Sequence, residues 1–90
     1  MAGRMTEETA ATLALTALVF LTRMAADMDR FLGGSGLDPA SLKARADEPE
    51  LQVAVLDFLL ANEPLLIAFC KEDSIQPRDV HMARHTLGGE

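Results

Sequence analysis

The chain has 90 residues, the length of one small domain, which leaves no room for a catalytic domain with an accessory one. Hydrophobic residues make up 49% and charged residues 24% of the composition, which excludes collagen, a disulfide-rich scaffold and an intrinsically disordered chain. The net charge of −6 and the absence of Trp and Tyr argue against nucleic-acid binding. Residues 46–90 carry the whole acidic excess, with three basic and nine acidic side chains, whereas residues 1–45 carry five of each.

The sequence lacks the usual features of an exported or membrane protein. Cys70 is the only cysteine, so no intramolecular disulfide can form, which suits a reducing compartment. The apolar stretch at residues 10–21 is too short to span a bilayer, and the longer one at residues 51–70 is interrupted by Asp57 and by residues 62–64. The N-terminus also lacks the pattern of a signal peptide, because acidic residues follow its first arginine. We therefore expect a cytoplasmic protein without membrane contact.

Apolar residues recur at helical rather than strand spacing, which predicts an all-α bundle of five or six helices. Thr6 and Asp38 are N-cap residues for the first and third helices, and a proline opens each of the last four. The glycines of GGSG at residues 33–36 are expected to end the second helix. The six expected helices cover residues 7–25, 28–32, 39–46, 49–61, 64–72 and 77–86. Residues 1–90 form one helical domain, in which we expect residues 1–5 and 88–90 to be disordered.

The first helix has an unusually broad apolar face, which predicts a helix that is surrounded on most sides or meets a partner. Its central stripe consists of Leu13, Ala17, Phe20, Leu21 and Met24, and the residues that widen it are Leu15, Leu18 and Val19. The side chains expected to be buried on the fourth helix are Leu51, Val55, Phe58 and Leu59. Those expected on the fifth are Leu65, Leu66, Phe69 and Cys70.

A shift of 38 residues aligns the chain with itself. Phe20 then falls on Phe58, Phe31 on Phe69 and Pro39 on Pro77, and six of the thirty-four positions between residues 13 and 46 are identical. This register predicts two similar three-helix halves. Since neither half can bury its apolar side alone, the two are expected to pack face to face.

Several segments resemble a known family. They are LxFL at residues 18–21, RFL at 30–32, GLDP at 36–39, VLDFLL at 55–60, and the stretches 63–69 and 77–84. In their order and spacing they resemble a family of short uncharacterised alphaproteobacterial proteins, catalogued only as a domain of unknown function. The resemblance implies a small, all-helical, cytoplasmic protein without an assigned activity, and it supplies no functional residues.

Two patterns raise the question of a ligand site. The glycines at residues 33–36 lack the preceding strand and the following lysine of a phosphate-binding loop, so they are interpreted as a helix end. His81 and His85 lie one helical turn apart, a spacing that can present two imidazoles to one metal ion. No third ligand is designated, although Asp79, Cys70 and Glu90 are available, so we predict no metal site and no cofactor.

Two further candidates concern catalysis. Cys70 is interpreted as a small core residue, because Glu72 and Asp73 oppose ionisation of a thiol there. Asp57 and Glu63 could form a general acid–base pair across the helix break, but structural roles account for both. Asp57 is also expected to pair with Arg23 or Arg30 between the halves. We therefore predict no catalytic residue.

The function best supported by the sequence is a non-catalytic protein-interaction module or small adaptor, with five Met that can adapt to a partner. Self-association into a homodimer is its simplest form. A small metal- or thiol-dependent enzyme or regulator using Cys70 or His81 and His85 is the alternative. A third hypothesis, an acidic antagonist of a basic nucleic-acid-binding protein, is based on the acidic residues 46–90.

Overall fold

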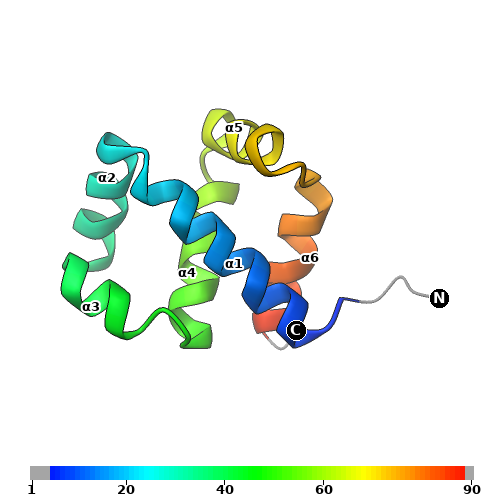
Figure 1. Cartoon of the computed structure of the whole chain (residues 1–90), viewed down its shortest axis with the longest axis horizontal. Coiled ribbons are helices and arrows are strands. Elements are labelled where there is room, and N and C mark those ends of the chain that lie inside the picture. Colours follow the sequence, from blue (N-terminus) through cyan, green and yellow to red (C-terminus); the bar gives the residue numbers. More distant parts are fainter. Residues whose placement is uncertain (1–4, 89–90) are drawn as a thin grey trace.

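The computed structural model describes residues 5–88, which form six helices (Figure 1). These helices follow the helical spacing of apolar residues in the sequence. They are α1 (Glu7–Thr22), α2 (Ala25–Ser35), α3 (Pro39–Ala44), α4 (Pro49–Leu60), α5 (Glu63–Asp73) and α6 (Pro77–Gly88). The described residues contain no strand and form one domain with a Cα radius of gyration of 12.3 Å. The predicted all-α class and the number of helices are therefore confirmed.

The helix ends follow the local sequence. The Thr6 hydroxyl accepts a hydrogen bond from the Thr9 backbone N–H at 3.1 Å, and the Asp38 carboxylate accepts one from Ser41 N–H at 2.7 Å. These are the side-chain caps that supply partners for otherwise unpaired N–H groups. Gly36 and Ser74, which follow α2 and α5, have left-handed backbones with φ of 73° and 55°. Such a residue is a common way for a helix to end.

The second helix is longer than the sequence prediction. It begins at Ala25, because the chain bends by 117° after α1, and it continues through Gly33 and Gly34 to Ser35. These glycines remain helical, and the Ser35 hydroxyl donates to the Phe31 carbonyl at 2.8 Å. The prediction of residues 28–32 was wrong because only Gly36 takes the left-handed conformation.

Helices α1, α3, α4 and α6 start at the predicted residues, and the remaining bounds of the other helices differ from the prediction by one to three residues. At the chain ends, residues 1–4 and 89–90 lie outside the described residues. Met5 packs against the core, and Gly88 is the last residue of α6.

Helices α1, α4 and α6 pack against one another and form the centre of the domain. In Figure 1, α1 crosses in front of α4 while α6 lies to one side, with α2 and α3 on the other side and α5 across the top. The largest fully buried side chains are Phe69, Leu21, Leu56, Leu59, Val55 and Val80. They come from α1, α4, α5 and α6, so the core joins the beginning and the end of the chain.

Two phenylalanine pairs connect the N-terminal half, α1–α3, to the C-terminal half, α4–α6. The rings of Phe20 and Phe69 lie 5.3 Å apart, and those of Phe31 and Phe58 lie 5.4 Å apart in an edge-on arrangement. Phe20, Phe31 and Phe69 are buried, whereas Phe58 is partly exposed beneath the Arg30 guanidinium. Phe58 is therefore less buried than predicted, because its ring lies at the outer edge of the contact between α2 and α4.

When the N-terminal half is shifted by 38 residues, the bounds of its helices can be compared with those of the C-terminal half. Helix α2 has the same length as α5 and is offset from it by 38, as are the starts of α3 and α6 and the ends of α1 and α4. The lengths of the other helices differ, since α3 has six residues and α6 has twelve. A duplication of the sequence is not shown by these bounds and stays a prediction.

We predict that Phe20→Ala destabilises the fold by about 3–5 kcal/mol, because it removes a buried ring and leaves a cavity. Phe58→Ala should cost less, since water already reaches part of that ring. Denaturant unfolding followed by circular dichroism measures both losses. Equal losses, or a smaller loss for Phe20→Ala, would contradict this order of burial.

Candidate functional site

The described part of the surface has an apolar groove between α1, α2 and α3, which we call the α1–α3 groove. Its volume is about 670 Å³. It is lined by Leu15, Leu18, Val19, Thr22, Met28, Leu32, Pro39, Leu42, Lys43 and Ala46. Nearly all of these side chains are apolar, so the groove favours apolar groups over charged ones.

One wall of the groove is the outer side of α1. Leu15, Leu18, Val19 and Thr22 have the spacing of residues on one face of a helix, and the groove therefore follows α1 for two turns. Leu15 is 38% and Val19 is 53% exposed. The broad apolar face predicted for this helix is thus divided, with one part in the core and one part on the surface.

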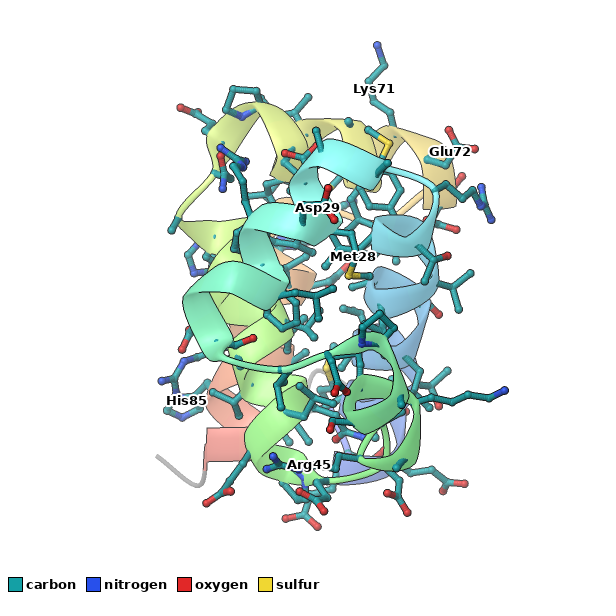
Figure 2. The ribbon with its side chains drawn as sticks, turned by 90° about the vertical axis from the view of Figure 1, so that its left-hand side faces the viewer. Met28, Asp29, Arg45, Lys71, Glu72 and His85 are labelled. Carbon is teal, nitrogen blue, oxygen red and sulfur yellow. The ribbon has the colours of Figure 1, made fainter. Side chains whose placement is uncertain are left out.

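The opposite side of the groove comes from α2 and α3. Figure 2 shows Met28 between α2 and α1, and Leu42 of α3 is buried and also lines the groove. Helix α3 makes few direct contacts with α1, and this separation leaves the groove open between them.

The outer face of α1 carries no charge. Between residues 9 and 22 the helix has no acidic or basic side chain. The hydroxyls of Thr12 and Thr16 donate to the carbonyls of Glu8 and Thr12 at 3.0 and 2.9 Å, and the Thr22 hydroxyl donates to Val19. Because these hydroxyl groups already donate to backbone carbonyls of the same helix, they do not require water to accept their hydrogen bonds.

Lys43 is the one charged residue that lines the groove. It is exposed and has no ion-pair partner in the part of the chain that the structure describes. The groove therefore combines apolar walls with a single positive charge, and none of the side chains that line it is acidic.

The structure does not bring the two histidines into a metal site. His81 and His85 are both exposed on α6, and Figure 2 shows His85 on the side of the molecule away from α1. Within residues 5–88, no group of three or more His, Cys, Asp or Glu side chains is close enough to hold a metal ion.

Cys70 lies in the core, packed on the inner side of α5. Burial, and to a smaller extent the negative charge of Asp79, raises the pKa of its thiol above the ordinary value of 9.0. Lys71 extends away from the body of the molecule (Figure 2). The thiol therefore lacks the cationic surroundings that activate a nucleophilic cysteine.

Asp57 pairs with Arg84, and the expected pairing with Arg23 or Arg30 was wrong. The Arg84 guanidinium donates to both Asp57 carboxylate oxygens, at 2.8 and 3.4 Å. The reason is that α6 packs on α4, a neighbour that the local sequence does not reveal.

Arg23 and Arg30, the two arginines expected to bind Asp57, have other partners. Arg23 binds Glu72 at 3.5 Å, and Arg30 binds Asp27 at 2.7 Å. Glu63, the proposed partner of Asp57 in an acid–base pair, is exposed in the first turn of α5.

Buried polar groups are rare in the described chain. Gln52 is the one buried polar residue recorded there, and its amide donates to the Ala46 carbonyl at 3.1 Å. No buried side-chain nitrogen or oxygen of residues 5–88 lacks a hydrogen-bond partner. The interior of residues 5–88 therefore holds no cluster of unpaired polar groups that could bind a substrate.

Among the described helices, none is by itself long and apolar enough to cross a membrane. The consecutive pairs α1–α2 and α4–α5 reach that length and composition only together, and they are bent by 117° and 108°.

Comparison with known proteins gives one match. The model of a family described as "Protein of unknown function (DUF3572)" matches residues 7–90. No curated protein and no solved structure matches the chain. The match confirms the resemblance to a family of unknown function, while the alphaproteobacterial source stays a prediction.

The raised pKa of Cys70 has a consequence for stability. Because the unfolded chain loses the thiol proton at a lower pH than the folded chain, the free energy of unfolding should fall as the pH rises above about 9. We predict that the Cys70→Ala variant does not show the part of this decrease in the free energy of unfolding that comes from the thiol. Denaturant unfolding at pH 8 to 10 measures it, and identical pH profiles for the two proteins would show that Cys70 is not responsible.

Proposed function

The chain belongs to DUF3572, a family of proteins of unknown function, and we propose that it acts as a non-catalytic interaction module that binds through the α1–α3 groove. The observation that carries this proposal is the uncharged outer face of α1. A soluble helix ordinarily places charged residues on its exposed side. Here Leu15 and Val19 are exposed instead, beside a groove of about 670 Å³.

The distribution of polar groups supports a binding role over a catalytic one. General acid–base or nucleophilic catalysis requires titratable groups that converge on one place. Asp57 is paired with Arg84, Cys70 is buried as a thiol, and His81 and His85 lie on an exposed helix face. The metal- or thiol-dependent alternative therefore receives no support from this geometry.

The acidic residues give less support than their number suggests to the hypothesis of an acidic antagonist of a basic nucleic-acid-binding protein. Several of them bind arginines of the same chain, namely Asp57 with Arg84, Glu72 with Arg23, and Glu48 and Glu50 with Arg45. These exposed pairs reduce the acidic surface left for a basic partner. A cytoplasmic location is part of our proposal, because a reduced, buried cysteine suits a reducing compartment.

We predict that Val19→Glu weakens the binding of an apolar fluorescent dye, 8-anilinonaphthalene-1-sulfonate, to the folded protein. The charge would lie on the wall of the groove, where it repels apolar groups and the anionic dye. Titration of the dye measures the effect, and the expected loss in affinity is at least tenfold.

The matched control is Ile67→Glu, since Ile67 is 47% exposed on α5 and does not line the groove. Both positions are exposed, so neither change should alter the melting temperature much. Equal dye binding by the two variants would contradict the assignment of the groove as the binding surface.

A further inference from the structure

We propose that the α1–α3 groove binds a small amphipathic molecule, namely a medium-length aliphatic chain that ends in one carboxylate, with the carboxylate at Lys43. This inference rests on the proposed function, because it names the class of ligand for the same surface. It is carried by the chemistry of the groove lining, by the position of Lys43 and by the size of the groove.

The apolar lining of the groove favours an aliphatic ligand. Its inner part consists of the buried Leu42 and of Leu18, Met28 and Leu32, which pack against the core. None of the residues that line the groove is aromatic, so a flat aromatic ring gains no stacking contact there. Met28 has an unbranched, flexible side chain, which can adapt to a flexible chain laid against it.

The groove offers few partners to a ligand with several polar groups. Thr22 and Lys43 are the two lining residues with polar side chains, and the Thr22 hydroxyl already donates to the Val19 carbonyl. A hydroxyl or amide buried in the groove would lose its hydrogen bonds to water without gaining others, which is costly. The ligand should therefore be apolar except at one end.

Lys43 supplies the partner for that end. Pro39 and Lys43 lie one turn apart on α3, and both line the groove together with Leu42. On such a wall the methylene groups of a lysine cover apolar surface while its ammonium group stays in contact with water. No carboxylate of the described chain pairs with Lys43, and no lining residue is acidic, so the ammonium group is available to an anion.

The other cations of residues 5–88 are placed differently. Four arginines bind carboxylates of the same chain, in the pairs Arg23–Glu72, Arg30–Asp27, Arg45–Glu48 and Arg84–Asp57. Lys71 extends away from the body of the molecule (Figure 2), and Arg78 does not line the groove. Lys43 is thus the described cation that adjoins this apolar hollow.

The overall charge limits the ligand to one negative charge. A protein with a net charge of −6 repels anions at long range, and the repulsion grows with the charge of the anion. One lysine can compensate one carboxylate, whereas a phosphate monoester carries up to two charges at neutral pH. A monocarboxylate therefore fits the groove better than a phosphate.

The size of the groove suits a small molecule. From Leu15 to Thr22 the α1 wall rises about 10 Å, the length of an extended chain of about eight carbons. The groove volume of about 670 Å³ lies within the range of small-molecule pockets. A stable protein interface engages about 20–30 residues on each partner, which is more than the ten that line the groove.

The basic residues of α1 also argue for a single ligand molecule over a membrane surface. Helices that lie on a membrane usually carry several Lys or Arg beside their apolar side. Between residues 9 and 22, α1 has no basic side chain. Lys43 alone gives the groove one positive charge, which suits one carboxylate better than a charged lipid surface.

The test is the binding of sodium decanoate to the full chain, measured by isothermal titration calorimetry at neutral pH below the concentration at which decanoate forms micelles. We expect one decanoate per chain. Hexanoate has the same carboxylate and four fewer methylene groups, so it should bind at least tenfold more weakly because it buries less apolar surface.

The role of Lys43 is tested by Lys43→Glu, with Lys71→Glu as the matched control. Both variants change the net charge equally, and both lysines are exposed, so the melting temperatures should stay close to that of the parent chain. We expect Lys43→Glu to bind decanoate at least fivefold more weakly than Lys71→Glu does. Lys43→Arg should bind decanoate like the parent chain, and Lys43→Glu should bind decyltrimethylammonium, a cation on the same chain, more tightly than Lys71→Glu does.

A second measurement locates the ligand. Nuclear Overhauser effects are expected between the methylene groups of decanoate and the methyl groups of Met28 and Val19, which line the groove. Effects confined to residues outside the groove would overturn the inference. Absence of saturable decanoate binding, or equal weakening by Lys43→Glu and Lys71→Glu, would also overturn it.

The remaining outcomes separate this inference from the proposed function. If decanoate does not bind but the apolar dye still binds in a Val19-dependent manner, the inference fails and the groove remains a binding surface. Loss of both would remove the proposed function as well. If decanoate does not bind, a Val19-dependent association with phosphatidylcholine vesicles would assign the groove to a lipid surface, and a Val19-dependent dimer in sedimentation equilibrium would assign it to a second copy.

Discussion

The mutual packing of α1, α4 and α6 is the constraint on which the rest of this domain depends. These helices have between 12 and 16 residues, and helices of that length are marginal on their own in water. They persist because Leu21, Leu56 and Val80 are fully buried where the three helices meet. This packing fixes which side of α1 faces inward and therefore which of its apolar residues remain at the surface.

The groove follows from the unequal lengths of α3 and α6. Helix α6 has twelve residues and reaches along α4, where Arg84 binds Asp57. Helix α3 has only six, because the chain must turn back at residues 45–47 to begin α4, and the Gln52 amide holds this turn through the Ala46 carbonyl. The outer side of α4 is thus partly covered by a neighbouring helix, whereas the outer side of α1 is left open.

Much of the fold was predictable because its signals are local. Asp38 and the prolines at the helix starts act through adjacent backbone groups, and Phe69 and Cys70 occupy the predicted apolar face of α5. The partner of Asp57 and the groove beside Val19 depend instead on which helices become neighbours in the fold. For this region the sequence indicated only that the apolar face of α1 is too broad to be covered by one neighbouring helix. The continuation of α2 through Gly33 and Gly34 was missed, since glycine permits a helix end without requiring one.

The two phenylalanine contacts also have a consequence for how the domain comes apart. Phe20 and Phe31 belong to the N-terminal half, but each meets a ring of the C-terminal half, Phe69 and Phe58 respectively. Neither half retains an aromatic contact of its own once the halves separate. Loss of one side therefore exposes rings on the other, so the chain should melt in a single all-or-none step, and separate fragments of it should acquire structure only when mixed.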